Sequence, residues 1–262
     1  MTTIQHMTRQ QWGYRETGPI SPLPSPTDLD YVFVHHTAGR HPLDPVAAFR
    51  RLNDSCIAEG HRAIYYNWLV HYNPTTDVLT VAEGRGAQRS GATKDQNLNS
   101  ITVCVLGYFH PGTLQTPLYD AHVLGVAIAI ADAVKAGHIF KPGAIDGPKI
   151  LGHRDNPKHV GATACPGDVL YARVPGLAPL VDFLLAPPAQ PTLKLGDKSC
   201  EVAELQTRVR RYDTAMVVDG VFGAETDRIV RNWQAFFGHP VTGVVAEPFW
   251  DLLDALDKAA TH

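Results

Sequence analysis

The sequence is poor in cysteine and contains no long apolar run. Four cysteines occur among its 262 residues, widely spaced and without a Cys-x-x-Cys pair. This usage favours free thiols over a disulfide framework. No apolar stretch approaches the ~18 residues of a membrane-crossing helix. The longest one, residues 123–134, is interrupted by Asp132 and is typical of a buried helix.

A strong excess of either charge is also missing. The 23 basic and 26 acidic residues give a net charge of −3, which indicates neither nucleic acid nor an anionic membrane as the main partner. The first ten residues contain no basic segment followed by an apolar one. We therefore expect neither a secretory signal peptide nor membrane insertion. Hydrophobic residues make up 44% of the chain, which is enough for a buried core.

A proline-rich segment divides the chain. Residues 185–191 read L-A-P-P-A-Q-P, and three prolines in seven residues favour an extended, semi-stiff spacer. The length of the chain also suits two domains better than one. We predict a first domain over residues 1–186, a linker over residues 187–192 and a second domain over residues 193–262.

The first of these parts alternates between strand and helix patterns. Strands are predicted where β-branched and aromatic residues cluster, and helices where apolar residues recur at helical spacing. The predicted strands are residues 31–35, 66–71, 78–82 and 101–106, and the predicted helices are residues 45–60 and 119–136. Asp44 suits the N-cap of the first helix, and Asn73 opens a hairpin turn. The pattern predicts an α/β domain with a mixed central β-sheet flanked by helices.

The second part contains a short internal sequence repeat. Residues 218–225 (V-D-G-V-F-G-A-E) resemble residues 241–247 (V-T-G-V-V-A-E), and each glycine falls where a turn precedes a helix. Helices are expected over residues 201–212, 224–237 and 247–256. These features predict a small three-helix domain.

Two segments offer metal ligands. His35 ends a predicted buried strand and His36 follows it, and the end of a strand holds a side chain rigidly in one direction. His153 and Cys165 lie 12 residues apart, and imidazole nitrogen and thiolate sulfur are ligands that zinc prefers. Each segment alone is equally compatible with ordinary histidines at a strand end or a free cysteine in a loop.

Taken in order, several motifs resemble those of the type-2 N-acetylmuramoyl-L-alanine amidases, the catalytic relatives of peptidoglycan recognition proteins. The resemblance covers roughly residues 8–173. It is carried by residues 8–13 (T-R-Q-Q-W-G), 32–38 (V-F-V-H-H-T-A), 65–70 (Y-Y-N-W-L-V), 83–86 (E-G-R-G), 91–92 (G-A), 99–101 (N-S-I), 152–155 (G-H-R-D) and 163–168 (T-A-C-P-G-D).

The resemblance implies a zinc hydrolase acting on the amide between N-acetylmuramic acid and L-alanine. It assigns the zinc ligands to His35, His153 and Cys165, with His36 as a neighbour only. It also implies catalytic roles for Tyr66 and for Thr163, which stands where relatives carry Thr or Lys. Tyr66 could instead be a core aromatic residue in a strand.

Two further residues are candidates for substrate binding. Strand alternation predicts that Trp68 shares a face with Tyr66 and Val70, as part of the core or of the groove wall. Arg85 follows a strand and could bind a carboxylate on the stem peptide. A structural ion pair is an equally good explanation for Arg85.

The chain departs from the family pattern at three points. The interval from His153 to Cys165 is 12 residues where many relatives have 8, so residues 156–161 look like an insertion that carries a rival ligand, His159. Thr93 follows Ala92 where relatives usually have histidine. Cys56 has no nearby partner for the small disulfide of many animal relatives.

The C-terminal part, residues 193–253, resembles the three-helix peptidoglycan-binding domain of many wall hydrolases. The resemblance implies that it tethers the enzyme to bacterial peptidoglycan. Together with the missing signal peptide, it suggests a phage endolysin, monomeric and held in the host cytoplasm until release. The alternative is a non-catalytic recognition protein of the same fold.

Overall fold

A computed structural model describes residues 2–40, 42–112, 115–144, 146–186 and 190–259. The chain divides into two compact units, Met1–Ala186 and Pro187–His262. The expected linker begins with residues 187–189, which lie outside the described residues. Among the described residues, no helix combines the length and the apolar character needed to cross a membrane.

The first unit is built on a six-stranded sheet with the strand order β1-β4-β3-β5-β2-β6. The strands are β1 (Thr3–Met7), β2 (Tyr31–His36), β3 (Trp68–Asn73), β4 (Val78–Glu83), β5 (Ser100–Val105) and β6 (Lys149–Gly152). Only the β3–β4 pair is antiparallel, while β1–β4, β3–β5, β2–β5 and β2–β6 are parallel. The predicted mixed sheet is therefore confirmed.

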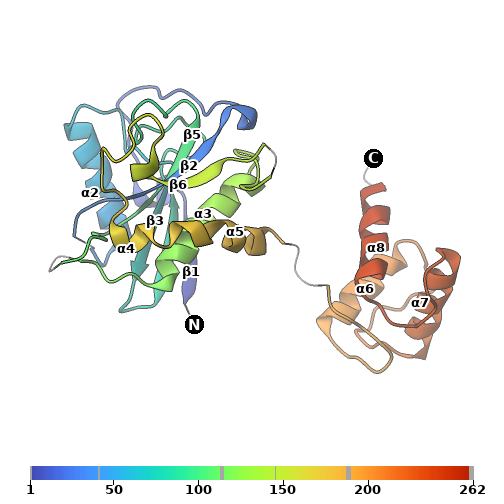
Figure 1. Ribbon diagram of the computed structural model, residues 1–262. Coiled ribbons are helices and arrows are strands. Elements are labelled where there is room, and N and C mark those ends of the chain that lie inside the picture. Colours follow the sequence, from blue (N-terminus) through green and yellow to red (C-terminus); the bar gives the residue numbers. More distant parts are fainter. Residues whose placement is uncertain (1, 41, 113–114, 145, 187–189, 260–262) are drawn as a thin grey trace. The chain divides into compact units, whose positions relative to one another are not determined.

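Helices cover both faces of this sheet (Figure 1). The unit contains α1 (Arg9–Trp12), α2 (Pro45–Ala58), α3 (Asp120–Lys135), α4 (Asp168–Tyr171) and α5 (Leu177–Leu185), with short 3-10 turns at Pro26–Asp28, His153–Asp155 and Val174–Gly176. The longest helix, α3, packs on β3, β4 and β5, and α5 packs on α3. The other face is covered by α2, so the central strands are buried on both sides.

The alternation of side chains along β2 decides which residues face which helix layer. Val32 and Val34 belong to the core cluster beneath α3. Cys104, which pairs with His35, belongs to the cluster beneath α2. Because successive side chains of a strand point to opposite faces, His35 lies on the α2 side and His36 on the α3 side.

Most predicted elements are present, with changes at their ends. Asp44 caps α2 by accepting a hydrogen bond from the Val46 backbone N–H at 3.0 Å. The hairpin turn forms, and the Asn73 carboxamide oxygen accepts from the backbone N–H groups of Thr75 and Thr76. One expected strand is wrong at its start, since β3 begins at Trp68 rather than at Tyr66.

The second unit contains α6 (Cys200–Arg210), α7 (Ala224–Phe236) and α8 (Glu247–Ala259) around one apolar cluster. This arrangement confirms the expected helical domain. Each copy of the internal sequence repeat is held by a buried glutamine. The Gln206 side-chain oxygen accepts from the backbone N–H groups of Asp219 and Gly220, and that of Gln234 accepts from Thr242 and Gly243. The turn in each copy of the repeat is thus stabilised by the same type of side-chain to backbone hydrogen bond.

Gly125 allows α3 to lie close to the sheet. A Cβ atom at this position would meet Val70 Cγ1 at 2.5 Å and Leu79 Cδ1 at 2.8 Å. Gly125→Ala should lower the free energy of unfolding by about 1–2 kcal/mol, because overpacking outweighs the gain of about 1 kcal/mol in helix propensity. Urea unfolding of the full chain would measure the change. Gly176→Ala, where a Cβ meets nothing within 4 Å, should leave the stability unchanged or slightly raised. An unchanged midpoint for Gly125→Ala would contradict the close approach.

Candidate metal centre

Three side chains distant in sequence meet at one end of the sheet. His35 is the fifth residue of β2, His153 directly follows β6, and Cys165 lies in the loop before α4. One ligand atom from each residue lies within 4.8 Å of the other two. The His35 and His153 ring centroids are 4.4 Å apart, and Cys165 Sγ lies 3.7 Å from His35 Nδ1. The three predicted ligands are therefore brought together.

Parallel pairing brings the two histidines together. In the β2–β6 ladder Val34 pairs with Gly152, so the next residues, His35 and His153, continue side by side. Gly152 lets the Tyr171 ring pack closely against the end of β6, because a Cβ at this position would lie 2.7 Å from that ring.

The cysteine loop is fastened to the residue after His153. The Arg154 backbone N–H donates to the Cys165 carbonyl at 2.9 Å. The Arg154 guanidinium donates to Asp168 at 2.8 Å and also to the Ala164 carbonyl. The His36 backbone N–H points at Cys165 Sγ at 3.4 Å. These contacts hold the sulfur against the end of β2.

Burial sets the protonation states of the three groups. It lowers the pKa of His35 well below 6.5 and lowers that of His153 as well, so both imidazoles are neutral at pH 7. Burial raises the pKa of the Cys165 thiol to about 12, against smaller opposing effects of the His36 N–H and of Arg154. Two neutral nitrogens and one sulfur are a ligand set that fits zinc, and binding of the ion would require loss of the thiol proton.

Thr93 selects the nitrogen that His35 presents. The Thr93 hydroxyl lies 3.2 Å from His35 Nε2, which leaves Nδ1 directed toward Cys165. Thr93 is fully buried, and its backbone N–H donates to the Asn97 side chain. Outer partners of this kind orient metal-binding histidines. The sequence revealed only that the usual histidine was missing here, and no spacing pointed to this contact.

The His36 side chain takes no part in the cluster. Its Nδ1 accepts the Phe109 backbone N–H at 3.3 Å, and its ring packs near Tyr108 and His110 on the α3 side. Burial lowers its pKa to about 4. His159, the rival ligand, instead pairs with Asp95 at 2.6 Å and is outside the three-residue cluster found among the described residues.

Tyr66 lies beside the centre although it is not in a strand. Its ring centroid is 5.3 Å from that of His35, and its ring packs against the core cluster beneath α2. Burial, with Cys104 and Cys165 nearby, raises the pKa of its phenol well above 10. The phenol is therefore a hydrogen-bond donor at neutral pH rather than a base. Thr163 is near as well, since its hydroxyl accepts the Cys165 backbone N–H at 3.1 Å.

Trp68 is not brought to the centre. It is 7% exposed and belongs to the cluster beneath α3, with its ring 6.1 Å from that of His138. It shares this cluster with Val70 but not with Tyr66. The alternation argument failed because β3 begins only at Trp68, so Tyr66 is not part of the pleat.

Arg85 is also largely internal. Its guanidinium is directed at backbone carbonyls, those of Ile64 at 2.5 Å, Arg89 at 2.8 Å and Ala63 at 3.4 Å. These contacts connect the segment before β3 to the loop after β4. The expected carboxylate ion pair does not match this set of partners, whereas the substrate contact stays a prediction, since Arg85 also lines a pocket.

Two parts of the chain match known protein families. Residues 25–168 match the family described as "N-acetylmuramoyl-L-alanine amidase", and residues 199–253 match the family described as "Putative peptidoglycan binding domain". A search of curated proteins found no match.

Solved structures of peptidoglycan recognition proteins have a similar fold. Drosophila peptidoglycan recognition protein SD is 26% identical with a TM-score of 0.51, over 64% of this chain and 92% of that one. Drosophila PGRP-LB is 21% identical with a TM-score of 0.53, over 66% and 93%. A human PGRP-Iβ C-terminal domain, solved with a glycosamyl muramyl pentapeptide, is 23% identical with a TM-score of 0.52, over 64% and 92%.

The protonation states predict how zinc affinity depends on pH. The imidazoles are already neutral, whereas the Cys165 thiol must lose one proton on binding. The apparent association constant should therefore rise about tenfold per pH unit between about pH 7 and 9. Competition with a chromophoric chelator would measure it. His159→Gln should show the same slope, and a pH-independent affinity would contradict the thiol assignment.

Proposed function

The chain belongs to the N-acetylmuramoyl-L-alanine amidase family, and we propose that it is a zinc-dependent enzyme of this activity. Its substrate would be bacterial peptidoglycan, cut at the amide between N-acetylmuramic acid and L-alanine. The observation that carries the proposal is the convergence of His35, His153 and Cys165 to within 4.8 Å. Three protein ligands are the number found in catalytic zinc sites, whereas structural sites use four.

Each nearby side chain has a role that follows from its chemistry. When bound, zinc supplies Lewis acidity and a water of lowered pKa. Tyr66, whose phenol stays protonated, donates a hydrogen bond to the carbonyl oxygen of the scissile amide as negative charge develops there. Thr163 holds the Cys165 backbone N–H and so fixes the loop that presents the thiolate. Thr93 keeps the His35 ring in one orientation.

A non-catalytic recognition protein is the second candidate. It is supported by the fold shared with recognition proteins, one of which was solved with a muramyl peptide bound. The presence of both Cys165 and Tyr66 favours the enzyme, because the thiolate ligand and the phenol are needed for hydrolysis but not for binding. Digestion of purified walls separates the two, since only an amidase releases new L-alanine amino groups without new reducing sugar ends.

Two substitutions test the roles separately. Cys165→Ser should lose zinc and reduce the rate of wall digestion by at least about 100-fold, because the third ligand is removed. Tyr66→Phe should keep zinc but lower kcat by about 100-fold, as expected for loss of one donor to the developing oxyanion. Metal content and amino-group release would be measured on the same samples.

The exposed Cys200 in the second unit provides a matched control, and Cys200→Ser should keep both zinc and activity. A fully active Cys165→Ser enzyme would refute the ligand assignment. A zinc-loaded wild-type chain that releases no amino groups would favour the recognition protein.

We further propose that the second unit tethers the enzyme to the wall and that the pair of units acts in lysis, as in a phage endolysin. The proposal is supported by the match of residues 199–253 to a peptidoglycan-binding family. A fragment ending at Ala186 should cleave a small soluble muramyl peptide as fast as the full chain. On suspended walls it should clear turbidity about tenfold more slowly or worse, because the raised local concentration is lost. Equal rates on walls would discard the tether.

A further inference from the structure

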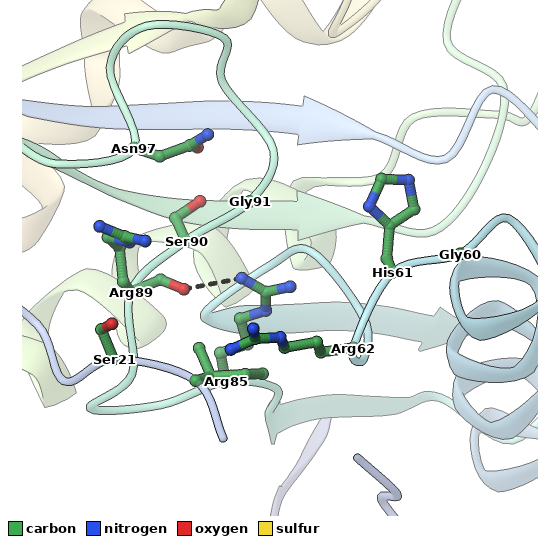
Figure 2. A pocket seen from close by; sticks show the side chains of 10 residues that line it. Ser21, Gly60, His61, Arg62, Arg85, Arg89, Ser90, Gly91 and Asn97 are labelled. Atoms are coloured by element: carbon green, nitrogen blue, oxygen red, sulfur yellow. Dashed lines mark hydrogen bonds between the residues drawn. The ribbon is translucent and has the colours of Figure 1, made fainter. Parts of the chain in front are cut away.

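The first unit contains a pocket of about 530 Å³ lined by three arginines. Arg62 comes from the segment after α2, whereas Arg85 and Arg89 come from the loop after β4. Figure 2 shows the three side chains around one hollow, with His61 and Asn97 at its edges. Such a concentration of guanidinium groups is unusual in a chain whose net charge is −3.

The positive charge of this pocket is not balanced by the protein. Across the described part of the chain, no carboxylate oxygen lies within 4.0 Å of a guanidinium nitrogen of these three arginines. Two nearby acids are engaged elsewhere. Glu59 accepts from the hydroxyls of Tyr65 and Ser55, and Glu16 accepts from the Gln88 carboxamide. Unpaired arginines that line a concave site favour an anionic ligand.

The three arginines have different freedom to bind such a ligand. Arg85 is 7% exposed, and its donors are directed at three backbone carbonyls. Gly91 leaves it room, since a Cβ there would lie 3.0 Å from Arg85 Nη1. Arg62 is exposed and donates to one carbonyl, that of Pro19. Arg89 is half-buried and lines the pocket, and its backbone is fixed by hydrogen bonds with Ser21 and Arg85.

Two short segments of the chain connect the pocket to the metal centre. Arg62 precedes Tyr66 by four residues, and Arg89 precedes Thr93 by four residues; Tyr66 and Thr93 both contact His35. Four residues span at most about 14 Å, the length of a short extended peptide. The two segments are also hydrogen-bonded to each other, since the Gly91 backbone N–H donates to the Tyr65 carbonyl at 2.9 Å.

We propose that Arg62 and Arg89 bind the α-carboxylate of the second stem-peptide residue, D-glutamate, and so hold the peptide in the direction that places its first amide at the metal centre. The inference rests on the proposed amidase function and adds the substrate feature that the site selects. Guanidinium groups bind planar carboxylates through paired hydrogen bonds, whereas a carboxamide offers no charge and only one acceptor. The enzyme should therefore prefer stem peptides in which the α-carboxylate of D-glutamate is free over those in which it is amidated to D-isoglutamine.

The test compares N-acetylmuramoyl-L-alanyl-D-glutamate with its D-isoglutamine counterpart, using the full zinc-loaded chain. The acid form should have a kcat/KM about tenfold higher than the amide form. Arg62→Gln and Arg89→Gln together should bring this ratio to about 1. Arg89→Lys should give an intermediate ratio, because lysine keeps the charge but loses the paired geometry. Arg51→Gln, an exposed arginine of α2 outside the pocket, should leave the ratio unchanged.

Binding of the product dipeptides, L-alanyl-D-glutamate and L-alanyl-D-isoglutamine, is measured by calorimetry on the same proteins. This arm needs no turnover, so it separates a failure of the carboxylate site from a failure of the amidase function. A preference for the acid dipeptide that the double variant abolishes supports the site even if no amide is cut. Equal kcat/KM and equal binding of acid and amide forms in the wild type would overturn the inference. So would a preference that survives in the double variant.

Discussion

The candidate site depends on the parallel pairing of β2 with β6. Strands that run in the same direction end at the same edge of a sheet, and the register of Val34 with Gly152 brings His35 and His153 together there. Neither histidine needs a flexible loop to reach the other. A one-residue shift of β2 would turn His35 to the α3 side and present His36 in its place. The buried residues of β2 thus fix both the core and the identity of the ligand.

The cysteine is positioned differently, by a loop whose hydrogen bonds return to the histidine strand. Arg154 follows His153 in sequence and binds the loop on both sides of Cys165, through its backbone and its guanidinium. The insertion expected at residues 156–161 does not disturb this contact, since the Gly161 backbone N–H donates to the Arg154 carbonyl. His159 within it is turned to Asp95. A longer loop is therefore compatible with the same three-residue cluster.

Motifs and periodicity predicted the α/β class, the hairpin and the three-helix second unit, because these follow from local patterns of burial and turn chemistry. The ligand set was available only through resemblance, since neither ligand segment was decisive alone. What the sequence could not reveal were contacts between segments far apart in the chain. Thr93 reaches His35 across 58 residues, and Arg85 binds carbonyls of a segment about twenty residues earlier. The predicted shared face of Trp68 and Tyr66 was wrong because the start of β3 was set two residues too early.

The metal centre and the arginine pocket of the first unit differ in their electrostatic character. The metal centre is nearly neutral before it binds an ion, because burial disfavours the charged forms of His35, His153 and Cys165 alike. The arginine pocket carries uncompensated positive charge that cannot be removed near neutral pH. A zinc ion would enter the first region by displacing the thiol proton, whereas the second favours anions over cations. In the binding mode that we propose, the carboxylate of the stem peptide lies in the pocket and the uncharged amide lies at the metal centre, because only the pocket offers guanidinium groups that pair with a planar carboxylate.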